Sequence, residues 1–168
     1  MPLRSKMRVE LTKEVQERML LCLSRSKRRE VGGILMAEQL KPGEFRIVDF
    51  SLDEITGSEA HFVRSPEHHY EALDDFFART GNDYARYNYL GEWHSHPNHQ
   101  PIPSATDIES MTNLLEEEEN ISFAVLLIVK KGWWRRLHCS AVLVRRGEPI
   151  SNVEVTAEVL GEKIAAPC

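Results

Sequence analysis

Two histidines and an aspartate lie at a spacing that suits a metal site. His94 and His96 are two residues apart, so on a strand both imidazoles point to the same face. A helix that begins near Ser104 would place Asp107 in its first turn, where its carboxylate is available as a third ligand. Two nitrogens and one oxygen leave a fourth tetrahedral position open, which is typical of catalytic rather than structural zinc. The residues therefore predict one zinc ion, held by His94, His96 and Asp107.

Such a ligand set favours hydrolysis. Zinc lowers the pKa of a bound water to about 7 and polarises a carbonyl oxygen, so hydrolysis of an amide is the chemistry to expect. The reaction also needs a base that takes the proton of the water and gives it to the leaving amine. Three glutamates are candidates by position: Glu92 before His94, Glu109 after the helix start, and Glu30 before an apolar run. Spacing alone leaves the choice among them open.

Several of these residues also have a purely structural interpretation. Ser104 and Asp107 have the form of a helix N-cap followed by an acid at the third helical position, a device worth about 1 kcal/mol. Capping and ligation are compatible, because a rigid helix start holds a ligand well. We interpret His99 as a variable loop residue, with contact to substrate or metal as the alternative. We interpret Trp93, Trp133 and Trp134 as core or hairpin packing, with a substrate groove near the pair Trp133 and Trp134 as the alternative.

Hydrophobic periodicity predicts the elements that position these residues. Apolar residues at helical spacing predict three helices, which begin near Thr12, Pro66 and Ser104, with Thr12 and Ser65 as N-caps of the first two. Runs rich in β-branched and aromatic residues predict strands at 31–36, 44–50, 86–96, 122–129, 133–144 and 153–160. We expect the strand at 86–96 to lead into the loop that carries the metal ligands.

Composition places the chain among ordinary globular proteins. Its 168 residues, 42% hydrophobic and 28% charged, suit one domain over 1–168, with a core at about 11–144 and a C-terminal tail at 145–168. The net charge of −5 argues against nucleic acid as a partner, and we interpret basic clusters such as 26–29 and 130–131 as solvated. Three scattered cysteines and the lack of a long apolar run predict a cytoplasmic protein without a membrane partner.

The pattern His94-x-His96-Pro97, with Ser104 and Asp107 following, resembles the JAMM signature of the MPN-type (JAB) metallopeptidases at every defined position. That family carries its catalytic glutamate shortly before a glycine-rich first strand of the sheet. Glu30-Val-Gly-Gly resembles that segment, so the resemblance favours Glu30 as the base. It also implies that Ser104 helps to stabilise the oxyanion. It covers roughly residues 11–144 and implies an α/β fold: a curved mixed β-sheet flanked by helices, similar to cytidine deaminases.

The resemblance implies an isopeptidase that acts after the C-terminal glycine of a ubiquitin-like modifier or its conjugate. The sequence looks like small bacterial JAB proteins encoded beside ubiquitin-activating and ubiquitin-conjugating (E1/E2-like) homologues. One such group accompanies CBASS antiphage systems, where the peptidase removes a cyclic-nucleotide synthase from its conjugated target. We expect the extended tail of the substrate to add as a strand beside the sheet. The alternatives are processing of a sulfur-carrier protein and, in another class, a non-catalytic MPN scaffold.

Overall fold

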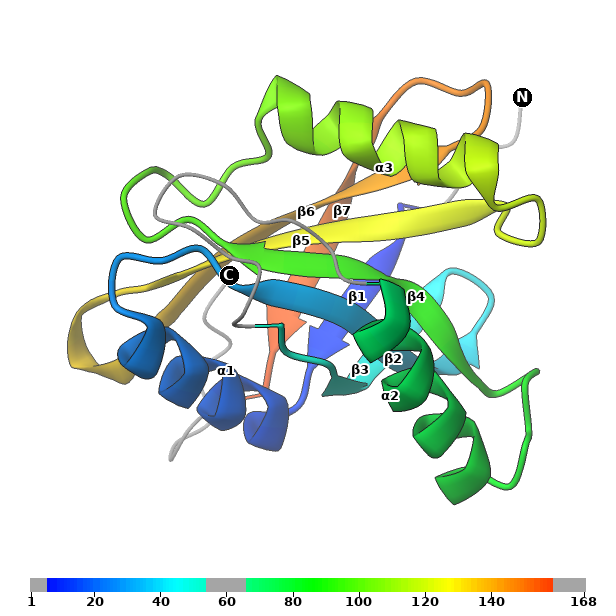
Figure 1. Ribbon diagram of the computed structural model, residues 1–168, viewed down its shortest axis with the longest axis horizontal. Helices are drawn as coiled ribbons and strands as arrows, with labels where there is room; N and C mark the ends of the chain where they lie inside the picture. Colours follow the sequence, from blue (N-terminus) through cyan, green and yellow to red (C-terminus); the bar gives the residue numbers. More distant parts are fainter. Residues whose placement is uncertain (1–5, 54–65, 159–168) are drawn as a thin grey trace.

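Seven strands close into a barrel in the order β1-β3-β2-β4-β5-β6-β7, with three helices around it (Figure 1). The computed structural model describes residues 6–53 and 66–158, and the side chains of α2 from residue 69 onward. The strands are β1 (Arg8–Leu11), β2 (Gly32–Lys41), β3 (Glu44–Phe50), β4 (Tyr87–Ser95), β5 (Phe123–Lys131), β6 (Leu137–Arg145) and β7 (Ser151–Ala157). The helices are α1 (Lys13–Ser26), α2 (Pro66–Arg79), α3 (Ala105–Glu117) and the 3-10 turn η1 (Trp133–Arg135).

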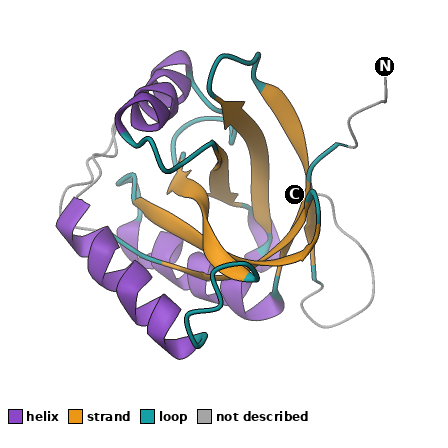
Figure 2. Cartoon of the chain, turned by 90° about the vertical axis from the view of Figure 1, so that its right-hand side faces the viewer, coloured by secondary structure: helices purple, strands orange, loops and turns teal. Residues whose placement is uncertain are grey.

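Alternation along β5 explains why helices pack on both sides of the sheet. Val125, Leu127 and Val129 belong to the cluster that fills the barrel, whereas Leu126 and Ile128 belong to a second cluster on the outer face. A strand buried on both faces needs a covering layer on each. The inner cluster includes residues of α1, and α3 covers the outer face over β5 and β6. Figure 2 shows the helices lying around the curved sheet.

The helices begin where local chemistry predicts. The Thr12 hydroxyl accepts a hydrogen bond from the Val15 N–H at 3.2 Å, which caps α1 as expected. Ser104 caps α3, and α2 begins at Pro66, whose missing N–H costs nothing in the first turn. The expected cap of α2, Ser65, lies outside the described residues. None of the helices in the described ranges is long and apolar enough to cross a membrane.

The sheet is mixed, as expected, but its closure differs from the curved sheet that the resemblance implies. β1 pairs in parallel with both β3 and β7, and this pairing joins the two ends of the sheet. Each described strand therefore has a neighbour on both sides, although the pairing is incomplete: β4 pairs with β5 only from Gly91 to Ser95, and this pairing does not extend to residues 87–90. The closing strands, β1 and β7, include residues outside the stretch 11–144. The end of the last predicted strand, beyond residue 158, lies outside the described residues.

One expectation about the hairpin between β5 and β6 is wrong. Trp133 and Trp134, interpreted as packing residues, are 88% and 98% exposed. They form the 3-10 turn at the hairpin tip instead of the start of a strand, and β6 begins only at Leu137. Trp93, in contrast, is fully buried in the barrel.

Candidate metal centre and active site

A bulge in β4 decides which side chains of that strand face outward. Opposite β2, Leu35 pairs with Gly91 and Met36 pairs with Tyr89, so Leu90 is an extra residue on β4. The bulge changes the phase of the alternation along the strand. Beyond it, Trp93 lies in the barrel core, and the residues on either side of Trp93 therefore face outward.

This alternation places the two histidine side chains on the outer face. His94 and His96 lie on the outer side at the end of β4, and both are buried. His94 pairs with Gly32 of β2, and a Cβ at Gly32 would stand only 2.7 Å from the Cβ of His94 and 2.2 Å from the Trp93 carbonyl oxygen. Glycine is therefore required here, and it leaves room for the imidazole.

Asp107 lies in the first turn of α3 and faces the two histidines. The Ser104 N–H donates to Oδ2 of Asp107 at 2.7 Å, and the Asp107 N–H donates to the Ser104 hydroxyl at 3.1 Å. This reciprocal capping box is the structural device that the sequence predicts. It also fixes the direction of the Asp107 carboxylate, so capping and ligand positioning coincide in one pair of residues.

The three predicted ligands form a compact triangle. Nε2 of His94 lies 3.2 Å from Nε2 of His96 and 3.2 Å from Oδ1 of Asp107, and Nε2 of His96 lies 3.3 Å from Oδ2 of Asp107. Ligand atoms about 2.1 Å from one tetrahedral zinc ion would stand roughly 3.4 Å apart. The donor types and their spacing therefore fit a zinc ion, and among the described residues these three form the group suited to hold a metal.

The electrostatics of the triangle suit metal ligation. Burial raises the pKa of Asp107, but hydrogen bonds from His94, His96 and the Ser104 N–H outweigh burial and hold this pKa far below its usual range. Nδ1 of His96 lies 2.9 Å from the Gln100 carbonyl oxygen. Because a carbonyl only accepts, Nδ1 carries a proton, and loss of the Nε2 proton on metal binding would leave the Nε2 lone pair facing the site.

Glu30, of the three glutamates considered, is brought next to the triangle in a buried position. The Val31 N–H donates to the Ser95 hydroxyl at 3.1 Å, and the Ser95 N–H donates to the Val31 carbonyl at 2.8 Å. These bonds hold the chain beside the end of β4. Glu30 is 4% exposed. Burial lowers the pKa of His96, but the hydrogen bonds with Asp107 and the Gln100 carbonyl outweigh burial and raise this pKa, and the charge of Glu30 adds a smaller contribution in the same direction.

The other two glutamates have different settings. Glu92 lies on β4 opposite Ile34 and, by alternation with Trp93, on the outer face that also carries His94. Glu109 is exposed on α3. Burial and proximity to His96 therefore distinguish Glu30, although the sequence spacing alone did not.

Sequence reasoning missed two contacts made by the loop between β4 and α3. Nε2 of His99 lies 3.6 Å from Oε1 of Glu30, and the His99 ring stands edge-on to the His96 ring with centroids 5.4 Å apart. The other contact is the Gln100 carbonyl bound to His96. Position inside the ligand loop was the only available signal for either residue, because no periodicity describes an irregular loop.

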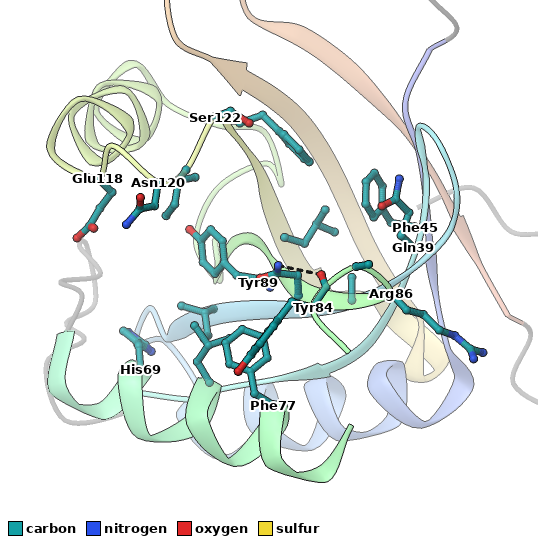
Figure 3. Close-up of a pocket in the computed structure, with 18 of the residues that line it drawn as sticks. Gln39, Phe45, His69, Phe77, Tyr84, Arg86, Tyr89, Glu118, Asn120 and Ser122 are labelled. Carbon is teal, nitrogen blue, oxygen red and sulfur yellow. Dashed lines mark hydrogen bonds between the residues drawn. The ribbon is translucent and has the colours of Figure 1, made fainter. Parts of the chain in front are cut away.

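A cleft of about 690 Å³ lies between α2 and the end of α3. His69 and Phe77 of α2, Tyr89 of β4 and Glu118 at the end of α3 are among its lining residues (Figure 3). None of the three metal-ligand candidates lines it. However, Ile34 lines the cleft and pairs with Glu92, so the floor of the cleft continues along the outer face of β4 toward His94.

Comparisons with known proteins identify the family of this chain. Residues 12–151 match the Prok-JAB family, described as prokaryotic homologs of the JAB domain. A segment of 67 residues is 36% identical to the CD-NTase/cGAS isopeptidase of Vibrio cholerae serotype O1, and it spans 40% of this chain and 40% of that relative. The solution structure of protein DSY2949 from Desulfitobacterium hafniense shares the fold, with a TM-score of 0.65, 21% identity, and coverage of 89% of this chain and 92% of that one. With a family match over most of its length, the chain belongs to the prokaryotic JAB-domain family.

Proposed function

We propose that this chain is a zinc-dependent isopeptidase that hydrolyses the amide bond after the C-terminal glycine of a ubiquitin-like modifier or of a protein conjugated in the same way. The observation that carries the proposal is the triangle of His94, His96 and Asp107 with buried Glu30 beside it. The similarity to a CD-NTase/cGAS isopeptidase supports a bacterial CBASS setting, in which the conjugated protein is the cyclic-nucleotide synthase.

Each residue of the site has a role in this proposal. His94, His96 and Asp107 hold the zinc ion, which when bound polarises the scissile carbonyl and acidifies water. The Glu30 carboxylate accepts the proton of the attacking water and then passes it to the leaving amine. The Ser104 hydroxyl accepts one bond from the Asp107 N–H and keeps its own proton to donate to the oxyanion.

The cleft between α2 and α3 supports a protein tail as substrate. Its lining is mainly apolar and aromatic, and its floor runs along β4 toward the site. Because each described strand has a neighbour on both sides, we propose that the extended tail lies over the outer face of β4 instead of adding as a further strand. A tail that ends in glycine, which lacks a side chain, suits the confined end of this path.

The test combines zinc content with cleavage of a fusion between a CD-NTase and green fluorescent protein. We expect Glu30→Ala to keep one zinc ion per chain and to lose at least about 10²-fold in kcat, because only the proton transfer is removed. His96→Ala should lose both zinc and cleavage. Glu109→Ala, an exposed glutamate on α3, is the matched control and should keep both.

Two outcomes would redirect the proposal. Full activity in Glu30→Ala together with inactivity in Glu92→Ala would move the base to Glu92. A wild-type protein that binds no zinc and cleaves no fusion would support the non-catalytic scaffold instead.

A further inference from the structure

The tip of the β5–β6 hairpin presents two tryptophans to solvent. The indoles of Trp133 and Trp134 are almost fully exposed, although tryptophan side chains carry large apolar surfaces. The tip is a closed turn: the Gly132 N–H donates to the Arg136 carbonyl at 2.7 Å, and the Arg136 N–H donates to the Trp133 carbonyl at 3.2 Å. The turn is therefore hydrogen-bonded, and it holds both indoles out of the core.

The backbone of this turn is unusual. Trp134 has φ 58° and Arg135 has φ 55°, so two successive residues with side chains adopt the left-handed region. That region is unfavourable for residues other than glycine. Glycine or asparagine would adopt this backbone conformation at lower cost. The presence of Trp134 and Arg135 instead suggests that their side chains have a function at this turn.

Seven cations lie on the segments next to the tryptophans. They come from the loop between α1 and β2 on one side and from the hairpin on the other, and they are Lys27, Arg28, Arg29, Lys130, Lys131, Arg135 and Arg136. Nζ of Lys131 donates to the Ser24 hydroxyl at 2.9 Å, which joins the hairpin to α1. We call these cations and the two tryptophans the tryptophan-basic surface. Its charge is opposite to the net charge of −5 of the whole chain, so the surface is a local concentration of positive charge.

The tryptophan-basic surface is continuous with the candidate active site. Nζ of Lys130 donates to the His99 carbonyl at 2.8 Å, and the Asn98 side chain donates to the Arg28 carbonyl at 3.2 Å. Both bonds tie the surface to the loop that follows the histidine ligands. In Figure 1 this loop, the start of β2 and the hairpin tip gather at the same end of the barrel. An occupant of this surface is thus held beside the scissile bond.

We propose that the tryptophan-basic surface docks an acidic face of a folded protein within the conjugate and so determines which conjugates are cleaved. The proposal rests on the proposed isopeptidase function. Tryptophan and arginine are the residues that most often dominate protein interfaces, and opposite charge accelerates and orients the encounter. A lipid bilayer on the same residues would lie against the ligand loop and obstruct it, so the position of the surface favours a protein partner.

The test compares two substrates that share one cleavage point. One is a folded CD-NTase fused to green fluorescent protein, and the other is a short quenched-fluorescence peptide with the same scissile glycine. We expect Trp133→Ala/Trp134→Ala and Arg135→Glu/Arg136→Glu to lower kcat/KM on the fusion by about tenfold or more, mainly through KM. Cleavage of the peptide should stay within about twofold of wild type, because these side chains lie outside the catalytic group.

A matched control lies at the other end of the barrel. Leu40→Ala/Lys41→Glu, near the β2–β3 turn, removes an exposed apolar side chain and reverses a charge, and it should cleave both substrates normally. Thermal unfolding of each variant checks that the fold is intact. In the Glu30→Ala protein, binding of the intact fusion should also shift tryptophan emission to shorter wavelength, and Trp133→Phe/Trp134→Phe should abolish that shift.

The outcomes separate the two proposals. If the wild type cleaves neither substrate, the proposed function fails and this inference fails with it. If all variants cleave the fusion as fast as the wild type, the docking surface alone is overturned. The docking surface is also overturned if the double tryptophan variant loses binding to phosphatidylglycerol vesicles while cleavage of the fusion is unchanged, since the surface would then serve a membrane.

Discussion

Asp107 combines an observed helix cap with a proposed metal-ligand role in a single side chain. Its Oδ2 accepts a hydrogen bond from the Ser104 N–H, which caps the N-terminus of α3. Its Oδ1 lies 3.2 Å from Nε2 of His94, and its Oδ2 lies 3.3 Å from Nε2 of His96. The pattern of serine and aspartate three residues apart predicted the cap correctly. The ligand role remains a prediction that the geometry supports. A helix start is well suited to both functions, because its backbone is rigid and its N–H groups orient a carboxylate.

Substitutions at Ser104 separate capping from catalysis. Ser104→Ala removes both the cap and the hydroxyl, so we expect about 1 kcal/mol lower stability and about 10²-fold lower kcat. Ser104→Asp keeps a capping oxygen and should keep stability, but it lacks the donor and should lose activity. Ser104→Thr keeps both functions. Chemical denaturation and cleavage rates measure the two effects, and normal cleavage by Ser104→Ala would contradict the oxyanion role.

At the scale of elements, the carboxylate of Asp49 on β3 forms ion pairs with both α1 and α2. Oδ1 of Asp49 lies 2.8 Å from Nη1 of Arg18 on α1, and Oδ2 lies 2.7 Å from Nη2 of Arg79 on α2. Burial raises the pKa of Asp49, but the bonds from Arg79, Arg18 and the Phe50 N–H outweigh it, and the pKa falls below its usual value.

The lowered pKa of Asp49 gives a prediction about pH. A carboxylate whose pKa is lower in the folded than in the unfolded protein stabilises the fold above the unfolded value, near 4, and this stabilisation disappears as the pH falls through the folded value. We expect Asp49→Asn to lower the free energy of unfolding by about 1 kcal/mol at pH 7, since both arginines are partly exposed. The difference from wild type should shrink toward pH 3.

A suitable control for Asp49 is Glu14, the other carboxylate near Arg18. Its side chain is 79% exposed and lies 3.9 Å from Nη1 of Arg18, so Glu14→Gln should have almost no effect on denaturation at either pH. An Asp49→Asn protein with unchanged stability at pH 7 would show that the two helix contacts contribute nothing net.

Long periodic elements were predictable from the sequence, and short or irregular ones were not. α1 and α3 begin at their predicted caps, because the signals are local. β1 was missed because it has only four residues and ends one residue before Thr12, so its last residue, Leu11, was assigned to the helix. The hairpin tip was misjudged at Trp133 and Trp134 because aromatic residues usually indicate burial. Exposure depends on the path of the turn, which composition does not encode.

At the scale of the whole molecule, the barrel core is separate from the candidate metal site. The inner cluster is built from strands and α1, whereas the ligands come from the outer side of β4 and the start of α3. The chain therefore does not need zinc to bury its core. Closure of the barrel through β1 and β7 could not be foreseen, because it depends on pairing between residues such as Val9 and Val155, far apart in the sequence.

Removal of zinc should lower stability without unfolding the chain. A metal that binds only the folded protein adds about 2.7 kcal/mol when free zinc is a hundred times its Kd. We expect a chelator to lower the Tm of the wild type while far-UV circular dichroism stays native. His96→Ala should show no response to the chelator. Complete unfolding of the wild type on chelation would indicate that the fold depends on the metal.

The bulge at Leu90 adds one residue to β4 upstream of the candidate site. One extra residue on β4 sets whether even or odd positions downstream face outward, and His94 and His96 share the outward parity. Deletion of Leu90 would leave Tyr89 opposite Met36 and Gly91 opposite Leu35, so Trp93 would still face the core and His94 would still face outward. The bulge thus accommodates one additional residue in β4 without changing which side chains face the candidate metal site.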